Sequence, residues 1–346
     1  MLYNKLIMKA KIAINGFGRI GRLFFKQAFE NPNFEIVAIN DLGNEENLAY
    51  LLKYDTVYGR YGKEVKAEPG AIVVDSKKIK FLQIKDPTQL PWKDLGIDIV
   101  VESTGVFESY EGAKVHITAG AKRVVITAPA KDADGTEGKT VLMGVNEGEL
   151  KSVVLTSNGS CTTNAASPVV QIMSENPGIE KAILNTVHGY TATQGIVDGP
   201  TKGNDFRRGR AAAQNIVPST TGAAIAVTRA VKGLAGKFDG MAIRVPVATG
   251  SVADITFISK RNVTTEEIND IFRKAANEPH WKGILKVSED QLVSSDIIGE
   301  PFGAVVDLGF TKVVDGNLVR VLSWYDNEAG YVSTLIKHVE SVASLV

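Results

Sequence analysis

The feature that most constrains the fold of this chain is a glycine-rich turn between an apolar strand and a helix near its start. Lys11–Asn15 has the pattern of a short buried strand, Asn15–Gly21 reads NGFGRIG, and Arg19–Glu30 repeats apolar residues at helical spacing. In such a turn the first glycine permits the tight bend, the second permits close approach of a pyrophosphate, and the third permits helix–strand packing. A plain strand-to-helix turn would use the same glycines, so this motif alone leaves nucleotide binding open.

The first half of the chain continues as strands that alternate with helices. Asn44–Lys53 has a helical pattern, and apolar strand patterns recur at Phe34–Asn40, Ala71–Val74, Ile97–Glu102, Arg123–Thr127, Thr140–Val145 and Val153–Thr156. Strands that alternate with helices favour a parallel sheet covered on both faces. The glycine turn therefore lies in the setting that a dinucleotide-binding α/β domain requires.

The second half has a different pattern, with longer strands and fewer helices. Strands are expected at Ala182–Tyr190, Met241–Ser259, Gly303–Val313 and Leu318–Tyr325, with a hairpin signal at Asp315-Gly316 between the last two. Thr264–Ala276 and the tail Glu328–Val346 have helical patterns, whereas Gly195–Gln214 is a long loop without periodicity. This half predicts an α+β domain with a largely antiparallel or mixed sheet.

The charge balance and the cysteine content indicate which classes of partner and which cellular compartment to expect. The 346 residues carry 39 basic and 39 acidic side chains, which gives no electrostatic reason to expect a nucleic acid or membrane partner. One cysteine cannot form an internal disulfide, so we expect a reducing compartment and a cytoplasmic location.

An acidic residue follows the glycine turn at the spacing of a ribose ligand. Asp41 ends the second expected strand, about 20 residues beyond Gly21, where a carboxylate binds a ribose 2′-hydroxyl. Leu42–Glu46 contains no basic residue to bind a 2′-phosphate, so the sequence favours NAD over NADP. Asp41 also fits a turn residue or a helix cap before Asn44.

The only cysteine lies at the expected start of a helix. Cys161 follows the turn signal Ser157–Gly159 and is surrounded by hydroxyl-bearing and amide residues. At a helix N-terminus a thiolate is stabilised by free N–H groups, so Cys161 is a candidate nucleophile with a lowered pKa. A buried, inert cysteine is the commoner case and remains the alternative. Pro168 should kink or end this helix.

A histidine and two groups of arginines complete the candidate chemistry. Among four histidines, His188 ends an apolar strand before the long loop, which makes it a candidate base or a structural histidine. Arg244 lies within an apolar strand, and Arg207, Arg208 and Arg210 lie late in the loop. Two arginine groups with nearby threonines suit two phosphate sites, although a buried ion pair would also account for Arg244.

Taken together, the motifs closely resemble phosphorylating glyceraldehyde-3-phosphate dehydrogenases from about residue 9 to residue 346. The matching segments, in order, are Asn15–Arg22 (NGFGRIGR), Glu102–Phe107 (ESTGVF), Ser157–Asn164 (SNGSCTTN), His188–Gln194 (HGYTATQ), Arg210–Pro218 (RAAAQNIVP), Thr221–Ala224 (TGAA), Arg244–Pro246 (RVP) and Ser323–Tyr331 (SWYDNEAGY). Ala165, Gly159 and Ala329 depart from the usual residues of the family, and none of these changes removes a reactive group.

The resemblance implies a role for each candidate residue. Cys161 would attack the aldehyde carbon of glyceraldehyde 3-phosphate, His188 would act as the base, and inorganic phosphate would cleave the resulting thioester to give 1,3-bisphosphoglycerate. NAD would be bound by Gly16, Gly18, Arg19, Ile20, Asp41, Lys85, Thr127, Asn327 and Tyr331. The substrate phosphate would be held by Thr191, Thr193 and Arg244, and the attacking phosphate by Ser160, Thr162, Arg208, Thr221 and Gly222.

The resemblance also implies a domain organisation and an assembly, and other functions remain as alternatives. It implies a homotetramer with no metal, a Rossmann-type cofactor domain over 1–160 with 328–346, and a catalytic domain over 161–327. Erythrose-4-phosphate dehydrogenase shares the cysteine and histidine but hydrolyses its acyl-enzyme, and Thr221–Ala224 fits the phosphate-using enzyme better. A semialdehyde dehydrogenase, or a redox-sensing or RNA-binding protein with a retired active site, explains the motifs less well.

Overall fold

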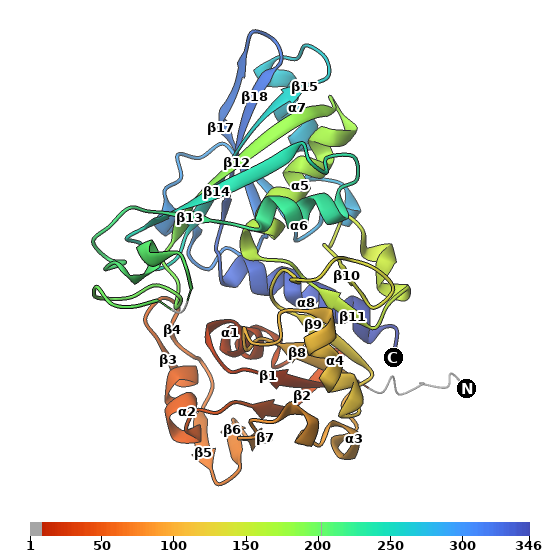
Figure 1. Ribbon diagram of the computed structural model, residues 1–346, viewed down its shortest axis with the longest axis vertical. Coiled ribbons are helices and arrows are strands. Elements are labelled where there is room, and N and C mark those ends of the chain that lie inside the picture. Colours follow the sequence, from red (N-terminus) through yellow and green to blue (C-terminus); the bar gives the residue numbers. More distant parts are fainter. Residues whose placement is uncertain (1–8, 202) are drawn as a thin grey trace. The chain divides into compact units, whose positions relative to one another are not determined.

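The computed structural model describes residues 9–201 and 203–346, and the chain forms two compact units (Figure 1). Unit 1 extends to Lys139 and includes Glu149–Ser157 and Leu335–Val346, whereas unit 2 comprises Thr140–Gly148 and Asn158–Thr334. The first eight residues of the expected cofactor domain lie outside the described residues.

Unit 1 is built on a nine-stranded sheet in the order β10-β11-β9-β8-β1-β2-β7-β6-β5. Strands β11, β9, β8, β1, β2 and β7 pair in parallel, and β7, β6 and β5 add an antiparallel edge. The strands are β1 (Ala10–Asn15), β2 (Phe34–Asn40), β5 (Val65–Glu68), β6 (Ala71–Val74), β7 (Lys77–Leu82), β8 (Ile99–Glu102), β9 (Arg123–Ile126), β10 (Gly138–Thr140) and β11 (Leu155–Ser157), with a separate hairpin of β3 (Tyr54–Asp55) and β4 (Gly59–Arg60). The predicted parallel α/β architecture is confirmed.

Helices form in unit 1 where the sequence supplies apolar spacing and caps. They are α1 (Arg19–Ala28), α2 (Glu45–Lys53), α3 (Trp92–Leu95), α4 (Tyr110–Thr118) and most of α8 (Ala329–Ala343). Helix α1 buries Leu23, Phe24 and Phe25, and Asn44 caps α2 by accepting a hydrogen bond from the Asn47 N–H at 3.0 Å. Because β1 pairs with both β2 and β8, the strand order reverses at the carboxyl end of β1, the usual ligand position in such sheets.

Helix α8 buries a neutral histidine in unit 1. His338 is fully buried, its Nε2 lies 2.9 Å from the Thr156 hydroxyl, and burial lowers its pKa to about 3. Because the pKa of an unfolded histidine is near 6.5, the neutral side chain contributes stability above that pH, and the contribution is lost as the pH falls toward 3.

We therefore expect His338 to make unfolding sensitive to acid. Between pH 6.5 and 5.5 the free energy of unfolding should fall by about 1 kcal/mol because of this group alone. Urea unfolding of wild type and His338→Gln at both pH values measures the difference. The exposed His280 gives the matched variant His280→Gln, which should retain the full loss; a loss equally reduced in both variants would contradict the assignment.

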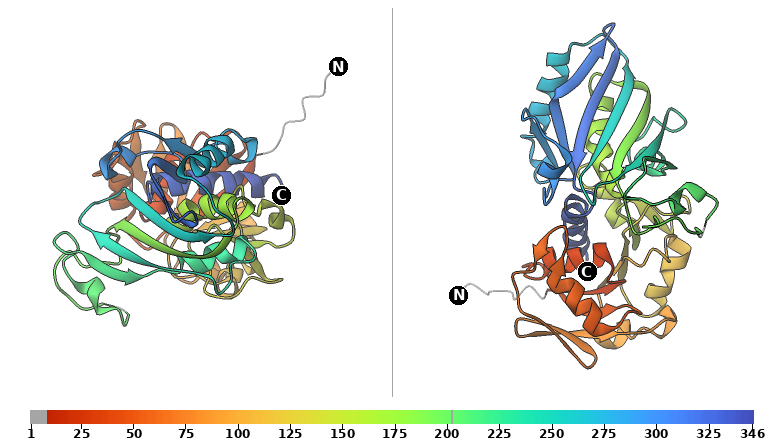
Figure 2. Two further views of the ribbon diagram at one scale, coloured as in Figure 1. Left: turned by 90° about the horizontal axis from the view of Figure 1, so that it is seen from above. Right: turned by 90° about the vertical axis from the view of Figure 1, so that its left-hand side faces the viewer.

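Unit 2 contains a seven-stranded mixed sheet in the order β13-β14-β12-β15-β18-β17-β16, whose long strands lie side by side in Figure 2. The strands are β12 (Ile179–Gly189), β13 (Val217–Thr220), β14 (Phe238–Val245), β15 (Ser251–Ser259), β16 (Leu285–Ser288), β17 (Ala304–Val314) and β18 (Leu318–Tyr325), and the helices are α5 (Cys161–Glu175), α6 (Ala223–Ala230) and α7 (Thr265–Ala275). Residues of all three helices share one apolar core with the sheet. The predicted mixed α+β fold is confirmed.

Two expectations about strands are wrong in detail, and one of two alternatives for a helix is excluded. Met241–Ser259 is not one strand but parts of β14 and β15, which lie on opposite sides of β12, because Pro246 and Gly250 (φ +91°) turn the chain between them. The strand expected over Thr140–Val145 ends at Thr140, and the Asn146 side chain instead accepts from the Leu142 N–H at 2.8 Å. Pro168, expected either to kink or to end its helix, lies inside α5 and does not end it, so the kink stays a prediction.

Candidate functional site

Unit 1 has a pocket of 440 Å³ at the carboxyl ends of β1, β2 and β8. It is lined by Asn15, Gly16, Gly18, Asn40, Asp41, Leu42, Ile84, Lys85, Pro87, Ser103, Thr104, Val106 and Phe107. Gly16 has φ +93°, and a Cβ there would lie 2.6 Å from the Thr104 nitrogen, so only glycine fits this turn. A Cβ on Gly18 would meet nothing within 4 Å, which leaves open space at the start of α1.

These residues fit a dinucleotide. Helix α1 begins at Arg19 with no side-chain cap on its first N–H groups, as a bound pyrophosphate requires. The Asp41 carboxylate accepts from the Phe17 N–H at 2.6 Å and from the Gly43 N–H at 2.8 Å, which fixes both oxygens at the edge of the pocket. A carboxylate held in this way retains lone pairs for ribose hydroxyls.

The other predicted cofactor residues have varied surroundings. Lys85 lines the pocket, and the Arg19 side chain is paired with Asp55 at 2.7 Å, so Arg19 and Ile20 present their backbone at the helix start. Thr127 follows β9, and its N–H donates to the Glu102 carbonyl at 3.0 Å. The pocket lining omits Thr127, and Asn327 and Tyr331 belong to unit 2.

In unit 2, Cys161 is the first residue of α5, as predicted. Ser160 caps the helix: its hydroxyl accepts from the Thr163 N–H at 3.1 Å, and the Thr163 hydroxyl accepts from the Ser160 N–H at 3.1 Å. Tyr331 donates to the Gly159 carbonyl at 3.1 Å and so fixes the turn before the cysteine. The thiol is therefore rigidly placed at a helix N-terminus.

The structure brings Cys161 and His188 into contact. Sγ of Cys161 lies 3.3 Å from Nε2 of His188, the second-last residue of β12. The Gly189 carbonyl lies 2.6 Å from Nδ1 of His188, and because a carbonyl only accepts, the tautomer with a proton on Nδ1 satisfies this contact. Nε2 then offers its lone pair to the thiol, which is the arrangement of a nucleophile and its base.

Burial keeps both Cys161 and His188 uncharged at rest. Burial raises the pKa of the Cys161 thiol, although the charge of Arg244 and the N–H groups of Thr162 and Cys161 act in the opposite direction. Burial and the positive charge of Arg244 lower the pKa of His188 to about 3. The expected lowering of the thiol pKa by the helix terminus is therefore wrong, because desolvation outweighs it. The resting pair is a neutral thiol beside a neutral imidazole, so the thiol needs the base.

Arg244 lies beside His188 without a carboxylate. The two residues are directly opposite on the parallel strands β12 and β14, and Nη1 of Arg244 lies 2.5 Å from Nδ1 of His188. Among the described residues no Asp or Glu forms a salt bridge with Arg244, so the ion-pair alternative does not hold. A half-buried guanidinium pressed against a protonated ring nitrogen is an unfavourable arrangement that a bound anion would relieve.

A second group of side chains predicted to bind anions lies at the long loop. Thr191 and Thr193 hydroxyls are 3.0 Å apart, and Arg208 donates to Thr193 at 3.3 Å and to Ser219 at 2.9 Å. Residues assigned to different phosphates, Thr193 and Arg208, are thus in direct contact. Gly222 precedes α6 without a side-chain cap, and the Thr221 hydroxyl accepts from the Ala223 N–H at 3.2 Å.

Two predicted residues use their polar groups within unit 2. The Asn327 oxygen accepts from the Thr249 and Ser251 hydroxyls and from the Gly250 N–H, which leaves its amide nitrogen to donate to a ligand. The Thr162 hydroxyl lies 2.8 Å from the Tyr325 hydroxyl and is buried, so its side chain contacts protein in this arrangement.

Sequence reasoning missed Tyr325. Its hydroxyl lies 2.8 Å from Thr162 and 2.7 Å from Thr186, and its ring packs edge-on against His188 with centroids 5.9 Å apart. Burial raises its pKa, so the phenol remains neutral and fixes the position of the imidazole. The sequence signal that could have identified Tyr325 is its position within the family-matched segment Ser323–Tyr331.

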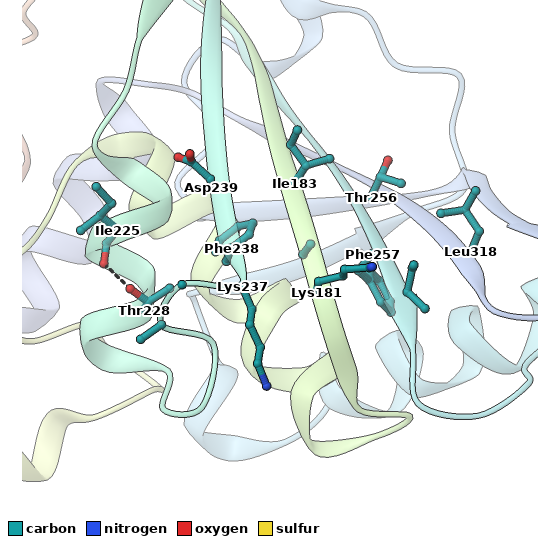
Figure 3. Close-up of a pocket in the computed structure, with 14 residues that line it drawn as sticks. Lys181, Ile183, Ile225, Thr228, Lys237, Phe238, Asp239, Thr256, Phe257 and Leu318 are labelled. Carbon is teal, nitrogen blue, oxygen red and sulfur yellow. Dashed lines mark hydrogen bonds between the residues drawn. The ribbon is translucent and has the colours of Figure 1, made fainter.

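A further groove in unit 2 is separate from this pair. It measures 810 Å³ and lies near the first residues of β12 and β14, including Lys181, Ile183 and Phe238 (Figure 3). His188 lies five residues beyond Ile183 along β12, about 16 Å in an extended strand. The groove is mainly apolar and contains none of the predicted site residues.

Other kinds of site find no support in the part of the chain that the structure describes. In residues 9–201 and 203–346, no three His, Cys, Asp or Glu side chains are grouped to hold a metal ion. Over the same residues, no helix combines the length and the apolar character of a membrane span.

Comparison with known proteins gives one consistent result. Residues 160–327 match the family model for the C-terminal domain of glyceraldehyde 3-phosphate dehydrogenase, and residues 10–110 match that for its NAD binding domain. Proteins named glyceraldehyde-3-phosphate dehydrogenase are similar over nearly the whole chain. The one from Clostridium pasteurianum is 45% identical over 97% of this chain and 99% of its own, that from Streptomyces coelicolor 48% over 95% and 97%, and that from Borreliella burgdorferi 49% over 94% and 97%.

Proposed function

The chain belongs to the glyceraldehyde-3-phosphate dehydrogenase family, and we propose that Cys161 and His188 carry the chemistry of that enzyme in this protein. The protein is an NAD-dependent oxidoreductase that acts on glyceraldehyde 3-phosphate. The observation that carries the residue assignment is the 3.3 Å contact between Sγ and Nε2 at the start of α5. Arg244, which lacks a carboxylate partner among the described residues, supports an anionic substrate beside it.

The first step forms a bond between sulfur and the aldehyde carbon. Nε2 of His188 takes the thiol proton as Sγ attacks, and the carbonyl electron pair moves to oxygen. The imidazolium returns the proton to that oxygen, which leaves a hemithioacetal on Cys161 and a neutral His188. The backbone N–H of Cys161, at the start of α5, supports the developing oxyanion.

The second step oxidises this carbon. NAD, held in unit 1 by the Gly16–Gly18 turn, the start of α1 and Asp41, supplies the hydride acceptor when bound. Nε2 of His188 takes the hydroxyl proton of the hemithioacetal, and the carbon becomes a thioester of Cys161. Asn327, whose amide nitrogen is left to donate, would bind the nicotinamide amide, and Tyr331 holds the turn before the thioester.

The third step cleaves the thioester with inorganic phosphate. A phosphate oxygen attacks the acyl carbon, the C–S bond breaks with its electrons on sulfur, and 1,3-bisphosphoglycerate leaves. Thr191, Thr193 and Arg244 hold the phosphate already on the substrate. The attacking phosphate is held by Ser160, Thr162, Arg208, Thr221 and Gly222. The Arg208–Thr193 contact supports two neighbouring anion sites.

A homotetramer is the assembly that we propose. On the strands of unit 2, Ile183 (60% exposed), Met241 (41%) and Leu318 (41%) present apolar side chains to solvent, an exposure typical of subunit interfaces. The long loop 195–214 then lies near the cofactor of a neighbouring subunit, as the family resemblance implies. A cytoplasmic location is supported by the single cysteine.

The experiment that tests the function is a phosphate-dependence assay. NAD reduction with glyceraldehyde 3-phosphate should require inorganic phosphate or arsenate, because each cleaves the thioester. Erythrose 4-phosphate, run in parallel, tests the sister activity. Sustained turnover without either anion would show that water cleaves the acyl-enzyme and would overturn the phosphorolysis.

Arg244 should contribute to recognition of the substrate phosphate. We expect Arg244→Met to lower kcat/KM for glyceraldehyde 3-phosphate about 100-fold, the effect of losing a charge-assisted hydrogen-bonding partner, and to change kcat/KM for unphosphorylated glyceraldehyde only a few-fold. The matched control is Arg320→Met, since Arg320 is exposed and paired with Asp254 at 2.6 Å. An equal loss on both substrates would show that Arg244 does not recognise the substrate phosphate.

A further inference from the structure

A chain of buried polar side chains passes beneath the unit 1 pocket. Trp92, His116, Glu102, Asn15 and Asn40 are each at most 6% exposed and are joined by consecutive hydrogen bonds. Asn15, Glu102 and Asn40 are the last residues of the neighbouring strands β1, β8 and β2. The chain therefore joins the three strand ends that carry the pocket.

Each hydrogen bond in this chain has one possible direction. The Trp92 indole N–H only donates, so Nδ1 of His116, 3.2 Å away, accepts, and Nε2–H donates to Glu102 Oε2 at 2.9 Å. At the other end, the Ile84 N–H donates to Asn40 Oδ1 at 2.9 Å, so the Asn40 amide nitrogen donates to Asn15 Oδ1 at 2.8 Å. The Asn15 amide nitrogen then donates to Glu102 at 2.6 Å.

Glu102 is where the two halves of the chain meet. One carboxylate oxygen accepts from Asn15 and His116, and the other accepts from the N–H of Thr104 at 2.8 Å and from its hydroxyl at 2.5 Å. Four donors surround a carboxylate that is 2% exposed, which is the pattern of an ionised, fully satisfied buried acid.

Through Thr104 the carboxylate contacts the pocket wall. Ser103, Thr104, Val106 and Phe107 line the pocket, and the Phe107 ring packs edge-on against His116 with centroids 5.8 Å apart. A Cβ on Gly16 would lie only 2.6 Å from the Thr104 nitrogen, so this backbone leaves no room for a side chain there. The backbone held by Glu102 is thus packed directly against the glycine turn.

We propose that Glu102 is a positioning residue for the dinucleotide. It holds the wall segment 103–107 against the Gly16 turn, so that the pocket has its binding shape before NAD arrives. This inference rests on the proposed function, because it assumes that NAD occupies the unit 1 pocket. Preorganisation of this kind increases affinity, because the wall does not have to be ordered on binding.

Glu102→Gln tests this role with little change in size. Either orientation of the new amide places its NH₂ against two donors, and the Thr104 hydroxyl can rotate to accept whereas the Thr104 N–H cannot. We expect the dissociation constant for NAD, measured by calorimetry on the full chain, to rise about tenfold, because either orientation leaves a buried donor of Thr104 or of the Asn15–His116 side without its partner. Amide exchange of residues 103–107 without NAD should become faster, while kcat at saturating NAD remains near the wild-type value.

The controls separate positioning from general stability. Glu35→Gln makes the same charge change at an exposed position of β2 and should leave NAD affinity and amide exchange unchanged. If Glu102→Gln does not fold, Thr104→Val, which removes one donor to Glu102, should show the same faster exchange and weaker NAD binding, and Thr104→Ser should restore both.

Two results would overturn the inference, and they differ from failure of the proposed function. If the Glu102→Gln variant folds and binds NAD with wild-type affinity, Glu102 has only a structural role. This conclusion would hold even if amide exchange in the variant were faster. If Glu102→Gln does not fold, wild-type NAD affinity in Thr104→Val would likewise reduce Glu102 to a structural residue. Failure of the wild-type protein itself to bind NAD would instead refute the proposed function.

Discussion

Cys161→Ser should lose essentially all dehydrogenase activity, with kcat reduced by about four orders of magnitude. Serine keeps the size and the helix-capping environment of the first residue of α5. Its hydroxyl is far less acidic than a thiol and a much poorer nucleophile, and an ester would replace the thioester that phosphate must cleave. Steady-state NADH formation with saturating substrate, NAD and phosphate measures the loss.

The same variant should bind NAD as the wild type does. The predicted contacts to the pyrophosphate and ribose of NAD lie in unit 1. The pocket there is lined by Gly16, Gly18 and Asp41 and not by Cys161. Calorimetric titration with NAD is the control, and a normal thermal melt shows that the variant is folded. Activity within tenfold of the wild-type value would remove the thiol from the mechanism, because no other cysteine exists to replace it.

The elements that we propose to bind the cofactor were predictable because their signals are local. Gly16, Gly18 and the helix from Arg19 lie within one short turn, and Asp41 follows at the end of the next strand. Glycine positions, strand length and helical spacing are properties of neighbouring residues, so one sequence carries them. The strand end at Asn40, directly before Asp41, and the helix start at Cys161 were found for the same reason.

Features that depend on distant residues were not predictable from local pattern. Cys161 and His188 are 27 residues apart, and only the position of β12 in the sheet brings them within 3.3 Å. Pro246 and Gly250 mark the turn within Met241–Ser259, but the placement of β12 between the two resulting strands is not shown by the alternation of apolar residues. The upward shift of the Cys161 pKa has the same origin, because desolvation depends on the whole surrounding core.

His188→Asn should lower kcat by a factor on the order of 10² to 10⁴, the usual contribution of a positioned base. Because burial raises the pKa of the Cys161 thiol, the thiol remains protonated near neutral pH unless His188 accepts its proton. The variant's activity should therefore increase as the pH is raised toward the thiol pKa, since hydroxide then produces the thiolate. The wild-type enzyme, whose His188 is neutral because burial lowers its pKa to about 3, should depend less on pH above 7.

Steady-state rates between pH 7 and 10 measure this difference, with His280→Asn as the matched substitution at an exposed histidine that should behave as wild type. The double variant Cys161→Ser/His188→Asn adds a sharper criterion. If the base acts only through the thiol, the second substitution should cost little once the thiol is gone, because residues that act as a unit lose their effect together. Independent, multiplicative losses would show that His188 acts apart from Cys161, and a pH profile identical to that of the wild type would exclude it as the base.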